Sequence, residues 1–169
     1  QDKHAEAEGT LRQAMQTFDE LAPAHPAVPD YRRIGALFQA RLARLQTLTN
    51  QTEAANQTLQ QAIDSHQKII EEFPQYSELG LVYLNLAILL TAAEQTEPAE
   101  AAYKRGVELV GSKADVLNNF AWRFATAPEA RFHQPRWAVE LAQKATELAP
   151  QSKTFFNTLG VAQYRAGKW

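Results

Sequence analysis

The sequence contains no cysteine, and this absence excludes several kinds of chemistry. Without thiols the chain has no disulfide, no thiolate nucleophile and no cysteine-ligated metal, and nothing indicates its redox compartment. The histidines His4, His25, His66 and His133 lack a second ligand at metal-binding spacing. We therefore expect no metal and no cofactor, and we interpret all of the histidines as surface residues.

Long apolar runs and an excess of one charge are also lacking. The longest apolar stretch, Leu79 to Ala93, is interrupted by Tyr83, Asn85 and Thr91, and it is shorter than the roughly 20 residues that span a bilayer. A net charge of −2 provides no bulk attraction to nucleic acid or to anionic lipid. We expect no nucleic-acid partner and no membrane insertion. A cytoplasmic location is favoured, although no residue specifies the compartment.

Catalytic motifs are absent as well. Glycine is sparse, and the chain has neither the glycine-rich phosphate loop nor the catalytic and metal-binding carboxylates of a kinase. Gly111-Ser112-Lys113 lacks the glycine spacing of a P-loop and instead predicts a helix end followed by a helix start. Ser65 and Lys68 have the spacing of a β-lactamase pair but no accompanying motif. We expect that this chain is not an enzyme.

A repeated pattern is the strongest signal that the sequence does contain. It places a small residue, a larger one four positions later and a small one three positions after that, as expected for one face of a helix. The copies recur at roughly 40–48 residues, a period typical of helical solenoids. They are Ala7-Leu11-Ala14, Ala55-Leu59-Ala62, Ala99-Tyr103-Gly106 and Ala138-Ala142-Ala145, the last with a small residue at the middle position.

The repeat divides the chain, which we treat as one all-α domain over residues 1–169 with about eight antiparallel helices. Residues 1–22 are the second helix of a truncated repeat. Residues 30–74, 77–111 and 112–150 are full repeats, the last with an insertion at 126–136, and residues 152–169 are the first helix of another. We interpret both chain ends as boundaries within a longer protein.

Helix ends have sequence signals of their own. Pro23, Pro26 and Pro29 predict that the first helix ends near Leu21. Gly111 predicts a C-terminal stop. We expect side chains to cap several helix starts: Asp30, Ser77, Thr96, Ser152 and a Ser112–Asp115 capping box.

The full repeat at 77–111 resembles a tetratricopeptide repeat (TPR). The matching positions are Tyr83, Leu86, Ala87 and Leu90 on the first helix and Ala99, Tyr103 and Gly106 on the second, with Ala138, Ala145 and Pro150 in a further copy. The resemblance implies a right-handed TPR-type α-solenoid. It also implies a non-catalytic scaffold that binds a protein or peptide on its concave face.

Three segments are similar to repeats in large planctomycete-type bacterial proteins: Leu117 to Trp122, Ala138 to Ala142 and Asn157 to Ala162. Many of those proteins carry a serine/threonine protein kinase domain before the repeats. The similarity implies a bacterial parent protein that includes such a kinase, outside this chain. The chain would then be a regulatory appendage of that enzyme.

First-helix residues outside the packing stripe are the candidate contacts on the concave face. Arginine and asparagine can hydrogen-bond a peptide backbone or a carboxylate, and tryptophan can anchor an interface. The polar residues and Trp122 are therefore the candidate partner-binding residues, although Asn85 and Asn119 also suit a structural role. The full set is Arg41, Arg44, Leu81, Leu84, Asn85, Ile88, Asn118, Asn119, Trp122, Asn157, Val161 and Arg165.

Two further groups of residues have alternative interpretations. The insertion region is basic and aromatic, so it is either a recognition loop or a packing element: Arg123, Arg131, Phe132, His133, Arg136 and Trp137. Leu159, Val161 and Tyr164 at the apolar end favour head-to-tail self-association into a homo-oligomer as an alternative function.

A separate aromatic stripe is expected in the core: Tyr83, Tyr103, Phe120, Phe124, Phe155 and Phe156.

Overall fold

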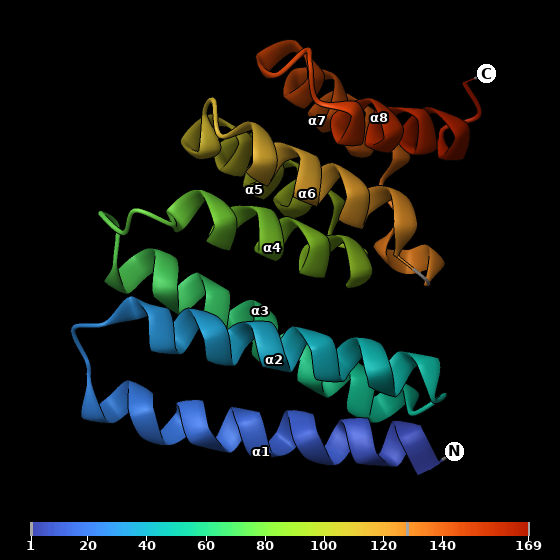
Figure 1. Ribbon diagram of the computed structural model, residues 1–169. Coiled ribbons are helices and arrows are strands. Elements are labelled where there is room, and N and C mark those ends of the chain that lie inside the picture. Colours follow the sequence, from blue (N-terminus) through green and yellow to red (C-terminus); the bar gives the residue numbers. More distant parts are fainter. Residues whose placement is uncertain (1, 128, 169) are drawn as a thin grey trace.

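A computed structural model describes residues 2–127 and 129–168, and within these ranges the chain is helical with no strand (Figure 1). This confirms the predicted all-α class. The helices are α1 (Asp2–Ala24), α2 (Pro29–Leu48), α3 (Thr52–Glu72), α4 (Leu79–Ala92), α5 (Thr96–Val110), α6 (Ala114–Thr126), the 3-10 helix η1 (Ala130–Phe132), α7 (Pro135–Leu148) and α8 (Lys153–Arg165). None of the described helices combines the length and hydropathy needed to cross a bilayer.

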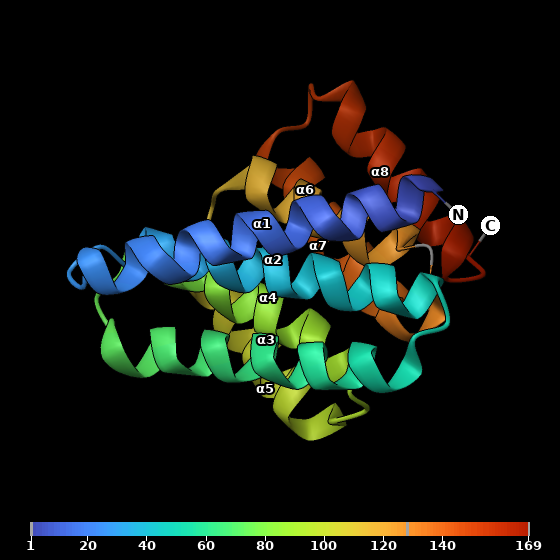
Figure 2. The same ribbon diagram turned by 90° about the horizontal axis from the view of Figure 1, so that it is seen from below.

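The helices are stacked in the order of the sequence. Each α-helix contacts the next, and α6 also contacts α8. Figure 1 shows α1 at one end of the molecule and α7 and α8 at the other, with α2 and α4 between them. The view from below in Figure 2 shows α3 and α5 on one side of α2 and α4. Contacts therefore join mainly elements that are close in sequence, apart from η1, which contacts α4.

Small residues allow α4 and α5 to approach closely. Ala87 on α4 and Ala99 on α5 are buried, as predicted. Gly106 leaves no room for a side chain, because a Cβ there would lie 2.7 Å from Leu84 Cγ. A Cβ on Gly80 would likewise lie 2.9 Å from the backbone nitrogen of Val110. The crossing is thus fixed at two points along the helix pair.

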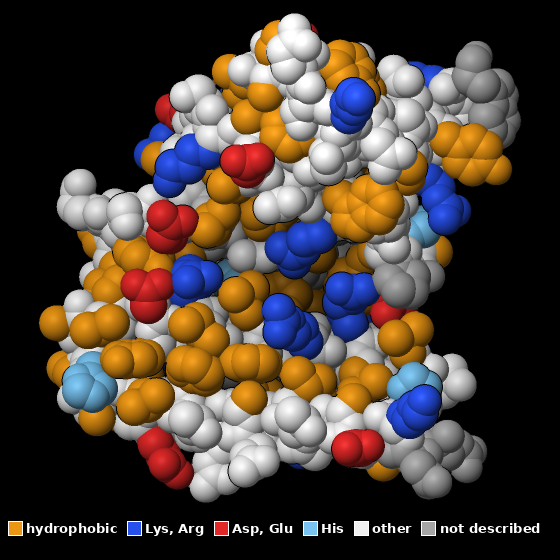
Figure 3. Space-filling model, in the orientation of Figure 1, with side chains coloured by type: hydrophobic (Ala, Val, Ile, Leu, Met, Phe, Trp, Pro, Cys, Tyr) orange, Lys and Arg blue, Asp and Glu red, His pale blue; other side chains and the backbone are white. Residues whose placement is uncertain are grey.

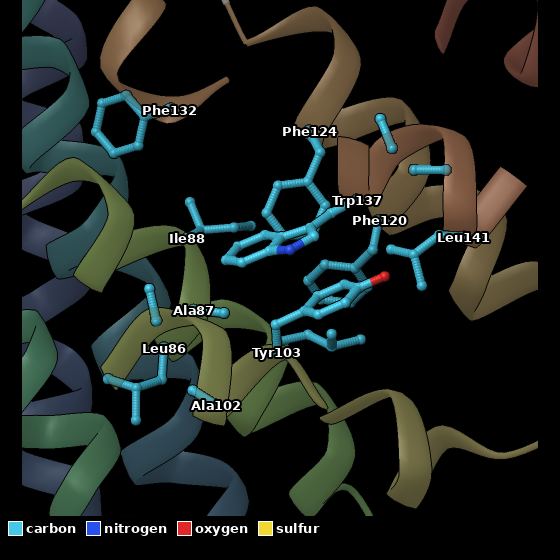
Figure 4. Packing of buried hydrophobic residues seen from close by; sticks show 14 of the residues in the cluster. Leu86, Ala87, Ile88, Ala102, Tyr103, Phe120, Phe124, Phe132, Trp137 and Leu141 are labelled. Atoms are coloured by element: carbon cyan, nitrogen blue, oxygen red, sulfur yellow. The ribbon is translucent and has the colours of Figure 1, made fainter. Parts of the chain in front are cut away.

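An aromatic cluster joins α5, α6 and α7 (Figure 4). The rings of Tyr103 and Trp137 stack with centroids 4.4 Å apart and planes inclined by 3°. Phe124 meets both rings edge-on, at 6.2 Å from Tyr103 and 5.4 Å from Trp137. Trp137, which the sequence associated with the insertion, is therefore a core residue.

The prediction of a core aromatic stripe is wrong for one residue. Phe156 on α8 is 52% exposed, and Tyr83 is only half-buried. The other four are buried. α8 packs mainly on α6 and α7, and Phe156 meets solvent.

The helix ends differ from the predicted caps. None of the described α-helices after α1 has a side-chain capping bond. α2 already begins at Pro29, so Asp30 lies in its first turn, and the Asp30 carboxylate instead accepts hydrogen bonds from Tyr76 and Arg33. The N-cap positions are Glu78 for α4, Gln95 for α5 and Lys113 for α6, so Ser77, Thr96 and the Ser112–Asp115 box do not cap; Ser152 has the predicted position without the bond.

The two predicted stops have different outcomes. Gly111 ends α5 with a φ of +60°, a conformation that favours glycine, and this confirms the prediction. α1 runs through Pro23 to Ala24, further than predicted. Pro23 lies in the last turn of an exposed helix, where water can satisfy the carbonyl that loses its amide partner.

Candidate functional site

A basic groove lies between α2, α4 and α6. We call it the arginine groove. It encloses a cavity of about 380 Å³ and is lined by Arg33, Leu37, Ala40, Arg41, Arg44, Leu81, Asn85, Phe120 and Arg123. Figure 3 shows arginine and lysine side chains gathered around a hollow in the middle of this face.

The spacing of residues on α2 builds one wall of the groove. Arg33, Leu37, Arg41 and Arg44 follow one another at three or four positions, so they share one face of the helix. α4 contributes residues four positions apart, and α6 contributes residues three apart. The groove is therefore formed by the first helix of each predicted repeat.

Arg33, at one end of the groove, is held by its neighbours. Its Nη2 donates to Asp30 Oδ1 at 3.0 Å, and its Nε donates to the Tyr76 hydroxyl at 2.9 Å. The Tyr76 hydroxyl donates to the same Asp30 oxygen at 2.6 Å. The hydrogen bonds from Tyr76 and then Arg33 lower the pKa of Asp30. This cluster ties α2 to the α3–α4 connection.

Arg44 pairs with an acidic residue from the far part of the chain. Glu129 lies on the α6–α7 connection, residues 127–134, and its Oε2 is 3.3 Å from Arg44 Nη2. The Glu129 side chain is only 7% exposed, and its Oε1 has no hydrogen-bond partner. Arg44, which lines the groove, is thus already paired with one buried carboxylate.

Arg41 and Arg123 have no acidic side chain within ion-pairing distance in the described part of the chain. Arg41 lies over the Phe38 ring, and Arg123 lies over the Phe120 ring at 4.8 Å. Arg123 Nη1 donates to Asn85 Oδ1 at 2.8 Å. These two guanidiniums therefore contribute uncompensated positive charge.

The charges in the groove also act on one another. Partial removal from water, together with the charges of Arg44 and Arg41, lowers the pKa of Arg123 to about 10, even though the residue retains solvent exposure. Arg123 still carries its proton at neutral pH. Because Arg123 is a cation without an acidic partner among the described residues, a carboxylate placed beside it would be stabilised. The groove therefore attracts anions.

A small apolar recess opens from the arginine groove. Its volume is about 30 Å³, and it shares Ala40, Arg44, Asn85 and Arg123 with the groove. Ile88, Leu89, Ala127 and Phe132 complete its walls. It can accommodate the end of a short apolar side chain.

The α6–α7 connection closes one side of this recess by packing. Phe132 is buried, and the guanidiniums of Arg44 and Arg131 lie over its ring at 5.6 Å and 5.2 Å from the centroid. Arg131 Nη2 donates to Thr47 Oγ1. Of the two interpretations of the insertion, these contacts favour packing.

The structure brings only some predicted contact residues together. Arg41, Arg44, Leu81 and Asn85 line the groove, and Ile88 lines the recess. Asn118 and Leu84 are buried and line neither the groove nor the recess, and Val161 packs against the core. The remaining predicted residues are exposed but lie outside the groove: Asn119, Trp122, Asn157 and Arg165.

Sequence reasoning missed five groove residues, of which Leu37, Ala40 and Phe120 are apolar and Arg33 and Arg123 are charged. Arg33 has the same-face spacing with Arg41 and Arg44 that would have identified it. Arg123 was assigned to the insertion, whereas α6 turns Phe120 and Arg123 toward the groove. The predicted face of α6 was therefore rotated by about one residue.

The histidines were expected at the surface, and His66 contradicts this. It is 0% exposed, and its Nδ1 lies 2.7 Å from the carbonyl oxygen of Ala62. It belongs to the buried stripe of α3. Within the described residues no group of three or more metal-ligating side chains is present.

Comparison of the chain with models of known protein families and with curated protein sequences finds no match.

Proposed function

We propose that the protein is a TPR-type α-solenoid that acts as a non-catalytic scaffold and binds an extended peptide or partner domain along the arginine groove. The observation that carries the proposal is the groove itself, which places uncompensated guanidiniums and an apolar recess on one concave surface. Concave sites with a few converging polar groups are the usual form of a binding site.

The order of the helices supports the solenoid assignment. α2 with α3, α4 with α5 and α6 with α7 form consecutive pairs, and the first helix of each pair lines the groove. A TPR array presents its first helices on the concave face in the same way, as the sequence resemblance implies. Helix pairs that stack on their neighbours create extended binding surfaces of this kind.

The chemistry of the groove supports binding rather than catalysis. Its charged residues are arginines, which remain protonated near neutral pH and do not exchange protons there. General acid–base catalysis requires groups that titrate close to the working pH. The described lining residues can recognise a partner through hydrogen bonds and electrostatic attraction.

A display library of random peptides tests the proposal. We expect selected peptides to bind the full chain and to lose binding in Ala40→Phe, because Ala40 lines both the groove and the recess and the larger ring fills them. Ala101→Phe, on the exposed surface of α5, adds the same ring elsewhere and is the matched control. Circular dichroism checks that both variants are folded.

Failure to select any peptide would contradict the proposal. So would peptides that bind wild type, Ala40→Phe and Ala101→Phe equally, because the groove would then have no part in binding.

Self-association through α8 is a second candidate function. Phe156 is 52% and Tyr164 63% exposed on this last helix. Apolar side chains at the end of a solenoid can stack head to tail between copies. We expect the mass measured by sedimentation equilibrium to rise with concentration for wild type and not for Phe156→Ser; a concentration-independent wild type would exclude this function.

The similarity to planctomycete-type repeats supports a wider proposal. The chain would be the interaction part of a larger bacterial protein with a serine/threonine kinase domain, located in the cytoplasm. The coding sequence on either side of this chain tests it directly, since a kinase would show its glycine-rich loop and catalytic aspartate.

A further inference from the structure

We infer that the ligand of the arginine groove is an acidic, extended protein segment that carries several side-chain carboxylates around one short apolar residue. The inference rests on the proposed binding function and specifies the chemistry of the partner. It is argued from four features of the groove: its charge, the carboxylate already paired with Arg44, its length and its recess.

The charge of the groove is strongly positive in a chain that is negative overall. Four arginines line it, and Asp30 and Glu129 pair with Arg33 and Arg44. Arg41 and Arg123 keep uncompensated charge. A partner with carboxylates placed opposite these two guanidiniums would restore the balance, and charge-assisted hydrogen bonds of this type are the strong ones.

Glu129 shows that Arg44 of the groove pairs with a carboxylate. It reaches Arg44 from the α6–α7 connection, and its side chain is almost fully buried there. Its Oε1 lacks a hydrogen-bond partner, so the pairing is incomplete. Glu129 therefore occupies Arg44 as an internal competitor of an acidic ligand.

The length of the groove indicates several acidic groups rather than one. Arg33 and Arg44 lie about 16 Å apart along α2, from the rise of an α-helix. An extended chain covers that distance in about five residues. A single chain-end carboxylate would engage only one part of this row of guanidiniums.

The recess adds an apolar requirement. It opens beside Arg44, Asn85 and Arg123, which it shares with the groove, and its inner walls are Ile88, Leu89 and Phe132. A short branched side chain such as valine, flanked by acidic residues, fits this arrangement. With a volume of about 30 Å³, the recess has room for the end of one such side chain.

Fluorescence anisotropy with synthetic peptides tests the inference. The probe is a labelled, C-terminally amidated peptide of Glu and Gly around one central Val. We expect the full chain to bind it at low ionic strength, and to bind the matched peptide with Gln for each Glu at least about tenfold more weakly. Affinity should fall as salt rises, because the Debye length shortens from about 10 Å at 0.1 M to 3 Å at 1 M.

Matched variants locate the binding to the groove. Arg41→Gln with Arg123→Gln removes the two uncompensated guanidiniums, which hold no ion pair within the fold. Arg12→Gln with Arg105→Gln makes the same change of net charge on exposed helix surfaces. We expect about a tenfold loss of affinity for the first pair, and no change for the second.

Glu129→Gln should raise the affinity for the acidic peptide, because it removes the charge that competes with the ligand for Arg44. We expect about threefold tighter binding of the acidic peptide, because Arg44 becomes available. Glu108→Gln, on the exposed surface of α5, changes the net charge equally and should leave affinity unchanged.

Three results would overturn the inference: equal affinity for the Glu and Gln peptides, equal effects of the two double-arginine variants, or preference for a neutral peptide with a free C-terminal carboxylate. If library peptides that depend on Ala40 then prove neutral or basic, the binding function stands while the acidic ligand is rejected. If no library peptide depends on Ala40, both are rejected.

Discussion

At the scale of single residues, His66 is the clearest case of position overriding residue type. Its ring is completely buried in α3, Nδ1 hydrogen-bonds the Ala62 carbonyl, and Nε2 has no partner. Burial lowers its pKa to about 4, with Arg123 and Arg33 contributing and the Ala62 bond opposing. The ring is therefore neutral at physiological pH.

This burial predicts a specific loss of stability in mild acid. The folded pKa lies below the unfolded value of 6.5, so between those values the unfolded chain binds a proton that the folded chain does not. The free energy of unfolding should fall by about 2 kcal/mol from about pH 7 to about pH 5. Urea titrations at the two pH values measure it.

His66→Leu is the control for this pH dependence. It fills the same buried position without a titrating group, so its unfolding free energy should change much less over that interval. An equal pH dependence in wild type and variant would assign the loss to other groups. Asp30 and Glu8, whose pKa values are lowered by hydrogen bonds, lose their contributions only in stronger acid.

The sequence did contain the signal for His66. Ala62, Ile63 and Ile69 form the buried stripe of α3, and His66 lies on the same stripe at three- and four-residue spacing. Its polar type suggested the surface instead. Helical register was the better guide, because a neutral imidazole with one hydrogen bond can be buried.

At the scale of elements, the α4–α5 crossing was the feature that the sequence predicted best, because its signals are local. The signature residues Ala87, Ala99 and Gly106 are local, and they meet within a pair of consecutive helices. The face of α6 was less accurate, because a rotation of about one residue is decided by packing against α7 and α8. The helix caps failed because backbone turns and other side chains, such as Tyr76 with Asp30, determine those ends.

Glycine-to-alanine substitutions test the crossing. In an open helix this change stabilises by about 0.5–1 kcal/mol. At Gly106 the new Cβ would overlap Leu84, including its backbone nitrogen at 3.0 Å, so we expect Gly106→Ala to destabilise by about 1–3 kcal/mol. Chemical denaturation measures the change in unfolding free energy.

Gly160 on α8 is the matched site, since a Cβ there would meet no atom within 4 Å. Gly160→Ala should stabilise by about 0.5–1 kcal/mol. If both substitutions shifted stability in the same direction, close contact at Gly106 would not be what fixes the crossing.

At the scale of the whole molecule, burial is distributed unevenly along the stack. α1 contacts mainly α2, and its described side chains are exposed or half-buried. α4 contacts α3, α5 and η1, and most of its residues are buried. Elements with few buried contacts open locally at lower free energy than the core.

Hydrogen exchange should therefore separate the two helices. We expect amides of α1 to exchange through local opening well before those of α4, whose protection should approach that of global unfolding. Mass spectrometry of peptides covering 2–24 and 79–92 measures both. Equal protection in the two segments would mean that the molecule unfolds as one cooperative unit.

The arginine groove belongs to this largest scale, and the sequence could predict only part of it. Arg41 and Arg44 were found from helical register on α2 alone. The pairing of Arg44 with Glu129 joins residues 85 positions apart, through a connection that carries no repeat pattern. Contacts of this kind depend on how the stack as a whole is assembled.

The near-complete burial of α4 restricts how the protein can be shortened. Apolar side chains surround this helix. A fragment that lacks one of the helices packed on α4 would therefore expose apolar surface and would tend to aggregate. A truncation point that leaves these contacts intact lies before α2, whereas a cut beyond Val110 would separate Tyr103 from Phe124 and Trp137. Laboratory dissection of the chain should treat α3, α4 and α5 as an indivisible block.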